Sequence, residues 1–365
     1  MYQAVNVSAA NYCYVKVFIN GAYMGLYLNV EQIDDEFLDR RYGNDTKNLY
    51  KCAWGSSLEL DNDIYNNSFF ELETNKLANH RSILQDFINF LNKTSQEQFD
   101  GGIDTVLNVP NAIRFLAVEA LIGHWDGYAY NQNNFYIYEN PATRIIEFIP
   151  YDLDNTFGID WVGRDWGTRD LMDWAAQRDG RPLHEKLLQN PEYKQLYVNT
   201  IHQLIEGDFS VDSIFPWFDF YKSLLTDAIQ AATFYNKTFG FTHEDFLDGH
   251  DKKVADHAPC GLKPYVSTRI EEALRQLPAS TVSVKAFPLQ VVNIYPNPSD
   301  GSFTIEIGDD TREQSEVIMY NLFGQVVHSQ KITSKYTEVS GITSGQYFVW
   351  IKSAEGIVVH KILVR

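Results

Sequence analysis

Acidic and amide side chains gather in one stretch of the sequence, residues 124–158. Its first part reads H-W-D, ending at Asp126, and Asn131 follows, which gives the spacing H-x-D-x4-N. In phosphoryl-transfer sites of this pattern, the aspartate accepts the proton of a substrate hydroxyl and the asparagine holds a metal ion. Aspartate and asparagine at these spacings also form ordinary turns, so a polar cap on a hairpin is the alternative interpretation.

Two apolar segments, 135–138 and 145–150, are separated by an Asn-Pro turn and predict a β-hairpin. Antiparallel pairing would bring Asn134, before the first strand, close to Asp152 and Asp154 after the second. Alternate side chains of an extended segment share a face, so both aspartates are expected to point the same way. Two such carboxylates repel unless a cation lies between them. Carboxylate and amide oxygens suit Mg²⁺ or Mn²⁺ better than zinc.

The sequence of 365 residues is 44% hydrophobic and has a formal net charge of −18. Residues 285–365 carry 7 basic and 8 acidic side chains, so nearly all of the excess charge belongs to residues 1–284. An acidic surface disfavours nucleic acid and anionic membranes and favours cations and basic partners, although solubility alone also accounts for it. No run of eighteen apolar residues occurs, so no membrane-spanning segment is expected.

Residues 12–32 alternate strongly around an Asn-Gly turn and predict a second hairpin. Its tip carries Gly21, Tyr23 and Gly25, and such a glycine-containing tip is able to lie over the phosphates of a nucleotide. A simple hairpin turn is the alternative.

A short apolar strand, residues 48–52, carries one lysine, Lys51. The acidic surroundings favour a phosphate-binding role for this lysine, with Glu31, or else Glu71 or Glu73, as its pairing partner. A solvated edge lysine is the alternative.

The remaining sequence predicts a helical part and a separate β-domain. Residues 183–277 have helical periodicity throughout. Short alternating strands with turn residues between them then predict a small β-sandwich. We therefore expect a first domain over residues 1–278, a linker over 279–290 and a second domain over 291–365.

The C-terminal sequence resembles the C-terminal sorting domain of the type IX secretion system of Bacteroidetes. The resemblance rests on YPNPSDGSFTIEI at 295–307, MYNLFGQVV at 319–327 and SGITSGQYFVWI at 340–351. It implies handling by the type IX secretion machinery, a location at the cell surface or in the medium, and no catalytic role for this domain.

The first domain resembles the CotH kinase family, the spore-coat protein kinases and their relatives. The matching motifs are VFINGAYMGLYLNVEQID, NLYK, D-x4-N-x2-N, FYIY, IPYDLDNTFG and YVSTRIEEALRQL. The resemblance implies an α+β fold of the atypical two-lobe protein-kinase type. It also implies roles for particular residues: Asp126 as the catalytic aspartate, Lys51 as the nucleotide lysine, Asn131 and Asp152 as metal ligands, and Asn134 and Asp154 as additional ligands.

One departure from the family concerns the N-terminus. Family members carry further strand sequence before the first hairpin, whereas about a dozen residues precede it here. We therefore expect a shortened N-terminal lobe.

The leading functional hypothesis is a secreted, metal-dependent kinase that uses ATP with Mg²⁺ or Mn²⁺ to phosphorylate Ser or Thr of a basic protein, or of itself. A catalytically inactive surface binding or adhesion protein on the same scaffold is the second hypothesis. A calcium site that only stiffens the fold is the third.

Overall fold

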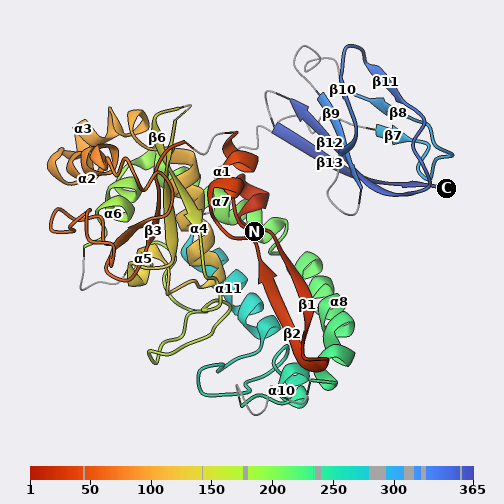
Figure 1. The fold of residues 1–365 in the computed structure, drawn as a ribbon, viewed down its shortest axis with the longest axis horizontal. Helices are drawn as coiled ribbons and strands as arrows, with labels where there is room; N and C mark the ends of the chain where they lie inside the picture. The colour runs from red at the N-terminus through yellow and green to blue at the C-terminus, as the bar shows by residue number, and fades with distance from the viewer. Residues whose placement is uncertain are drawn as a thin grey trace. The chain divides into compact units, whose positions relative to one another are not determined.

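The computed structural model describes residues 1–43, 46–141, 143–175, 180–232, 234, 240–278, 293–307, 316–321, 326–353 and 356–365. The chain divides into two compact units, residues 1–281 and 282–365 (Figure 1). Each unit has a hydrophobic core of its own. The predicted linker, residues 279–290, lies outside the described residues.

A four-stranded antiparallel sheet stands at the centre of the first unit. Its strands, in spatial order, are β4 (Phe70–Leu72), β3 (Leu49–Cys52), β5 (Phe135–Asn140) and β6 (Ile145–Pro150). Strands β5 and β6 pair along their full lengths, with Phe135 opposite Pro150, so the predicted hairpin is confirmed. The residues before β5 therefore lie beside the residues after β6.

Both faces of this sheet are buried. One face packs in the main core with α2 (Ser82–Lys93) and α4 (Val109–Ile122), and the other packs against α1 (Asp35–Tyr42). Because Lys51 of β3 is directly opposite Tyr136 of β5, its side chain lies on the α1 side.

Helix α4 is held in register with β6 by one buried side chain. The amide of Asn111 donates to the Phe148 carbonyl at 3.2 Å and accepts from the Phe148 N–H at 2.8 Å. At the other end of the helix, the Phe157 N–H donates to the Ile122 carbonyl at 2.8 Å. The last residues of α4 and of β6 consequently lie at the same edge of the sheet.

The described part of residues 182–278 is mostly helical, as predicted. Its helices are α6 (Pro182–Gln189), α7 (Pro191–Glu206), α8 (Val211–Gln230), α10 (His243–Asp248) and α11 (Leu262–Gln276). The buried Arg269 of α11 donates to the Ala120 carbonyl at 2.6 Å, and Tyr265 donates to the Leu121 carbonyl at 3.2 Å. These bonds satisfy carbonyl groups at the end of α4 that the helix itself leaves unpaired.

The short helical elements that complete the unit outside the site are η1 (Gln3–Val5), α3 (Gln96–Asp100) and η2 (Ile103–Thr105). No helix among the described residues is long and apolar enough to cross a membrane.

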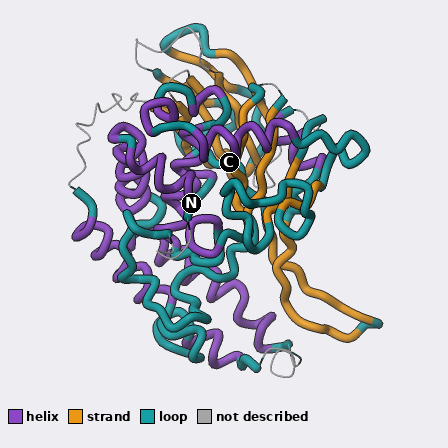
Figure 2. The backbone as a smooth tube through the Cα atoms, turned by 90° about the vertical axis from the view of Figure 1, so that its left-hand side faces the viewer, coloured by secondary structure: helices purple, strands orange, loops and turns teal. Residues whose placement is uncertain are grey.

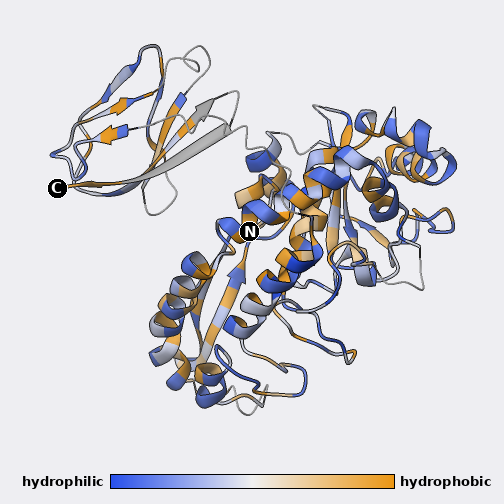
Figure 3. Ribbon diagram, turned by 180° about the vertical axis from the view of Figure 1, so that it is seen from behind, coloured by the Kyte–Doolittle hydropathy of each residue, from blue (hydrophilic) through white to orange (hydrophobic). Residues whose placement is uncertain are grey.

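The N-terminal hairpin forms as predicted but is a sheet of its own. Its strands are β1 (Tyr12–Ile19) and β2 (Ala22–Val30), and neither pairs with the central sheet. The hairpin runs alongside α8 (Figure 1) and extends as a long arm (Figure 2). Much of it is hydrophobic (Figure 3), although most of its side chains are exposed or half-buried.

The second unit is made of two antiparallel sheets. Their described strands are β7 (Asn293–Tyr295), β8 (Phe303–Glu306), β9 (Glu316–Asn321), β10 (Val326–Lys331), β11 (Tyr336–Val339), β12 (Gly345–Ser353) and β13 (Gly356–Val364). The orders are β10-β9-β12-β13 and β11-β8-β7, and residues of both sheets share one core. This is the arrangement expected of the predicted small β-sandwich.

The buried Glu139 of β5 makes the stability of the first unit depend on pH. It accepts a hydrogen bond from the Tyr50 hydroxyl at 2.9 Å, and burial raises its pKa from the ordinary 4.5 to about 7. A carboxyl group with a raised pKa in the folded state stabilises the protein fully below pH 4.5, and that contribution is lost as the pH rises through 7.

We expect Glu139→Gln to remove this pH dependence. The free energy of unfolding of the wild type should fall relative to that of the variant between pH 5 and pH 8, as measured by urea denaturation at both pH values. If the free energies of unfolding of the two proteins differed by the same amount at both pH values, the burial of an ionisable Glu139 would be contradicted.

Candidate active site

The candidate site begins directly after the end of α4. Gly123 adopts φ 74°, and its N–H group caps the last turn of the helix, which is a common left-handed termination. The ring of Trp125 then stacks on Trp166 with 5.7 Å between centroids, and its Nε1 donates to the Ile159 carbonyl at 2.8 Å. These contacts fix the backbone immediately before Asp126.

Four asparagine amides converge on the carboxylate of Asp126. Its Oδ1 accepts from Asn131 and, at 3.3 Å, from Asn133. Its Oδ2 accepts from Asn134 at 3.0 Å and from Asn155 at 3.3 Å. Neutral amide donors orient a carboxylate without supplying a counter-charge. The structure thus brings together the three residues of the D-x4-N-x2-N motif.

The loop after β6 brings two further carboxylates to this place. The extended segment that was expected to carry Asp152 and Asp154 does not form, because β6 ends at Pro150, Asp152 adopts φ 48° and a turn follows at residues 153–154. The carboxylates are nevertheless close. Burial, and then the negative charges of Asp152 and Asp126, raise the pKa of Asp154. Asn155 connects Asp126 with Asp154, since its Nδ2 donates to both carboxylates, to Asp154 at 2.9 Å.

His124 lies buried behind the same loop. Burial lowers its pKa to about 4, while the charge of Asp126 and backbone groups of Asn155 and Tyr151 act in the opposite direction. Its ring is therefore neutral at pH 7. We therefore do not interpret His124 as a proton donor.

The side chain of Lys51 contacts the aromatic side chain of Tyr151. Its Nζ lies 4.7 Å from the centroid of the Tyr151 ring and 3.4 Å from the Tyr151 hydroxyl. Because Tyr151 directly precedes Asp152, the lysine lies beside the loop that carries the two aspartates. The role of Lys51 as the nucleotide lysine stays a prediction.

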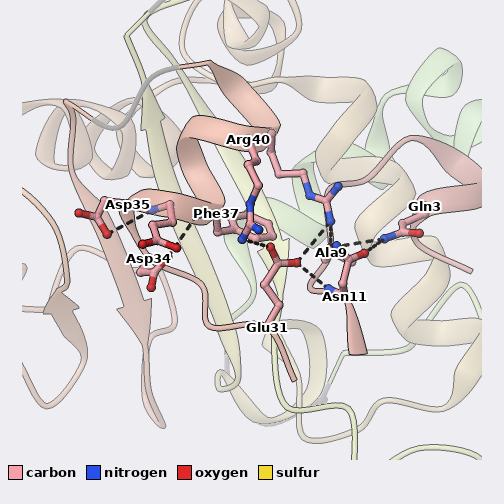
Figure 4. Close-up of polar contacts among 10 residues, drawn as sticks. Gln3, Ala9, Asn11, Glu31, Asp34, Asp35, Phe37 and Arg40 are labelled. Atoms are coloured by element: carbon pink, nitrogen blue, oxygen red, sulfur yellow. Dashed lines mark hydrogen bonds and ion pairs between the residues drawn. The ribbon is translucent and has the colours of Figure 1, made fainter. Parts of the chain in front are cut away.

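Glu31 has different partners from the one predicted. It forms ion pairs with Arg40 and, at 3.4 Å, with Arg41 (Figure 4), because α1 folds back over the end of β2. The structure therefore corrects the pairing of Glu31 with Lys51. Of the two other predicted partners, Glu71 lies directly opposite Lys51 in the β3–β4 register, whereas Glu73 forms an ion pair with Lys76 at 3.4 Å.

The predicted nucleotide-binding tip lies in the separate hairpin. Gly21 and Gly25 adopt φ values of 80° and 136°, and the Tyr23 hydroxyl donates to the Ala228 carbonyl of α8 at 2.9 Å. Tyr23 thus contacts the helical part of the unit, whereas Lys51 belongs to the central sheet. The hairpin itself is confirmed, and its role over a nucleotide stays a prediction.

The donor set fits a hard divalent cation that keeps part of its water. Among the described residues, no group of three or more His, Cys, Asp or Glu side chains is arranged to hold a metal ion. Mg²⁺, however, is commonly bound through one or two carboxylates together with water and phosphate oxygens. Asp152 and Asp154 supply two carboxylates here, and a cation between them would offset the burial and the repulsion that raise the pKa of Asp154.

Two site residues were not predicted. Asn155 follows Asp154 directly, so the sequence D-x-D-N contained a usable signal. Tyr151 had no such signal, since an aromatic residue at a strand end usually belongs to a core.

Comparison with known families assigns both units. Residues 1–272 match the family described as CotH kinase protein, and residues 293–365 match the secretion system C-terminal sorting domain. The first unit is thus a CotH domain with a mixed helix and sheet fold, and the chain belongs to the CotH family. Its sorting domain marks it for type IX secretion to the cell surface or the outside.

The curated relatives include the inner spore coat protein H of Bacillus subtilis, 24% identical over 212 residues that cover 57% of this chain and 56% of the relative. Two proteins of Rhizopus delemar also match. Spore coat protein homolog 1 is 26% identical over 48% of this chain and 30% of its own length. Invasin CotH2 is 20% identical over 70% of this chain and 45% of its own length. The chain thus spans about half the length of these relatives or less.

Among solved structures, a chain of PorZ, a surface component of the type IX secretion system of Porphyromonas gingivalis, matches 24% of this chain and 13% of its own length. The sequence identity is 19% and the TM-score is 0.19.

We expect that Gly127, the residue after Asp126, tolerates no side chain. A Cβ atom there would lie 2.1 Å from Oε1 of Glu119 and 2.6 Å from the His124 ring. Gly127→Ala should therefore lower the free energy of unfolding by about 1–3 kcal/mol through overpacking. Gly101→Ala, whose Cβ would meet its nearest atom at 3.4 Å, is the matched control. Equal urea midpoints for the two variants would contradict this geometry.

Proposed function

We propose that this protein is a secreted, kinase-like phosphotransferase that transfers the γ-phosphate of ATP to a Ser or Thr hydroxyl of a protein. The observation that carries the proposal is the Asp126 carboxylate, held by four amides beside Asp152 and Asp154. A carboxylate so oriented is suited to accept the proton of an incoming hydroxyl.

The other residues have roles that follow from their charges. Asp152 and Asp154, with the amide oxygens of Asn131 and Asn134, would hold Mg²⁺ or Mn²⁺, which neutralises charge on the phosphates. Lys51 would supply positive charge to the phosphate oxygens, with Tyr151 holding its side chain in place. In a kinase-like arrangement, the central sheet and α1 form one lobe and the helices after the sheet form the other.

The acceptor is proposed to be basic. The first domain carries nearly all of the net charge of −18, so its field attracts positively charged partners. Autophosphorylation is the second route, since the chain contains its own Ser and Thr residues.

A binding or adhesion protein without catalysis is the second candidate. It is favoured by the pairing of Glu31 with Arg40 and Arg41, which leaves Lys51 without that expected partner. The contact of Tyr23 with α8 also favours it, because it joins the predicted nucleotide-binding tip to the helical part of the unit. Such a protein should show no magnesium-dependent ATP binding by calorimetry, whereas the phosphotransferase should show it.

The proposal predicts that Asp126 is required for transfer. With ATP labelled at the γ-phosphate, Mg²⁺ and protamine as a basic serine-containing acceptor, Asp126→Asn should lower the rate by about 10²–10⁴-fold, the usual contribution of a general base. Asp86→Asn, at an exposed position of α2, is the matched control and should retain the wild-type rate. Absence of transfer by the wild type, or full activity of Asp126→Asn, would overturn the proposal.

Substitution of a proposed metal ligand should weaken cation binding, whereas substitution of an aspartate elsewhere should not. Mn²⁺ should raise the melting temperature of the wild type, and Asp152→Asn and Asp154→Asn should each weaken this effect because each replaces an anionic ligand of the cation by a neutral amide. The exposed Asp63→Asn serves as control. Stabilisation by Ca²⁺ with no further effect of ATP would instead support a purely structural cation.

A further inference from the structure

A buried glutamate lies under the candidate site and is not explained by the proposed chemistry. Glu119 belongs to α4, whose other side chains are nearly all buried and apolar, and it is itself 0% exposed. Its Oε1 accepts from the N–H of Tyr128 at 3.0 Å, and its Oε2 accepts from the N–H of Ala129 at 3.3 Å. These two donors begin α5 (Tyr128–Asn131), where a helix leaves its N–H groups unpaired.

A buried arginine holds the same helix by its carbonyl groups. Arg181, at the start of α6 and 1% exposed, donates from Nε to the Tyr128 carbonyl at 3.2 Å. Its Nη2 donates to the Tyr130 carbonyl at 2.5 Å. Burial raises the pKa of Glu119 to about 8, and the two N–H groups and the charge of Arg181 act in the opposite direction, so the two side chains influence each other.

Helix α5 depends on these contacts because it is too short to be stable alone. It has four residues, whereas isolated helices of fewer than about 12 residues are marginal in water. Its orientation is therefore set from outside, by α4 through Glu119 and by α6 through Arg181.

The orientation of α5 determines where the amides of the site lie. Asn131 is its last residue, and Asn133 and Asn134 follow within three positions. All three donate to Asp126. A displacement of α5 would consequently move three of the four amides that orient the candidate catalytic carboxylate.

We propose that Glu119 and Arg181 are positioning residues for Asp126, which act by holding α5 from its two sides. The predicted effect on catalysis rests on the proposed function. The claim that both residues hold α5 in place rests on the hydrogen bonds alone. The contacts named above join both residues to α5.

The test uses Glu119→Gln in the full chain. Glutamine keeps the volume of the side chain, but its Nε2 group cannot accept a hydrogen bond, so one N–H of α5 loses its partner. Arg181→Lys is the second variant, because lysine cannot donate to the two carbonyls in the fixed fork of a guanidinium group. Glu139→Gln is the matched control, since it changes another buried glutamate that lies in β5.

Hydrogen–deuterium exchange provides a readout independent of activity. We expect exchange in residues 124–134 to be at least about tenfold faster in both variants, with unchanged exchange in α7 and in the second unit, and with no change in residues 124–134 for Glu139→Gln. Unchanged exchange in residues 124–134, or faster exchange throughout the first unit, would overturn the proposal.

Steady-state kinetics provides the second readout. We expect kcat to fall by about 10–100-fold, while the KM for ATP changes by less than about threefold, because a misplacement of Asp126 affects chemistry and leaves Lys51 and the aspartates in place. Locally faster exchange with an unchanged kcat would overturn the positioning role. If the wild type transfers no phosphate, the proposed function fails, and the exchange data alone decide whether Glu119 and Arg181 hold α5.

Discussion

The site depends on one interaction, the convergence of asparagine amides on the carboxylate of Asp126. Three of these amides come from the segment after α4, and the fourth, Asn155, comes from the loop after β6. The interaction requires the ends of a helix and a strand to lie together. The bonds of Asn111 with β6 and of Arg269 with the end of α4 provide that alignment.

The sequence predicted the parts whose signals are local. Apolar residues alternate with polar ones, or follow one another without a break, on both sides of a turn in each predicted hairpin. Both hairpins, β1–β2 and β5–β6, form where these patterns occur. The motif around Asp126 was also predictable, because its residues are separated by only a few positions, although the orientation of α5 within it is set by Glu119 and Arg181.

The sequence did not predict contacts set by tertiary packing. The hairpin of β1 and β2 contacts α8, which follows about two hundred residues later, and no local pattern reports that contact. Glu31 was assigned to Lys51 by analogy with a template, whereas α1 brings Arg40 and Arg41 back to it. Glu119 within an apolar helix gave no indication of its partners, because Arg181 and α5 follow in later segments.

The most direct test of the account is to locate a metal–nucleotide complex in a crystal. Crystals grown with Mn²⁺ and a non-hydrolysable ATP analogue would show manganese by its anomalous scattering. The account predicts manganese at Asp152 and Asp154, with the terminal phosphate facing Asp126 and Lys51 near the phosphate oxygens. Manganese and nucleotide bound elsewhere, or an unaltered Asp126 region at saturating nucleotide, would contradict it.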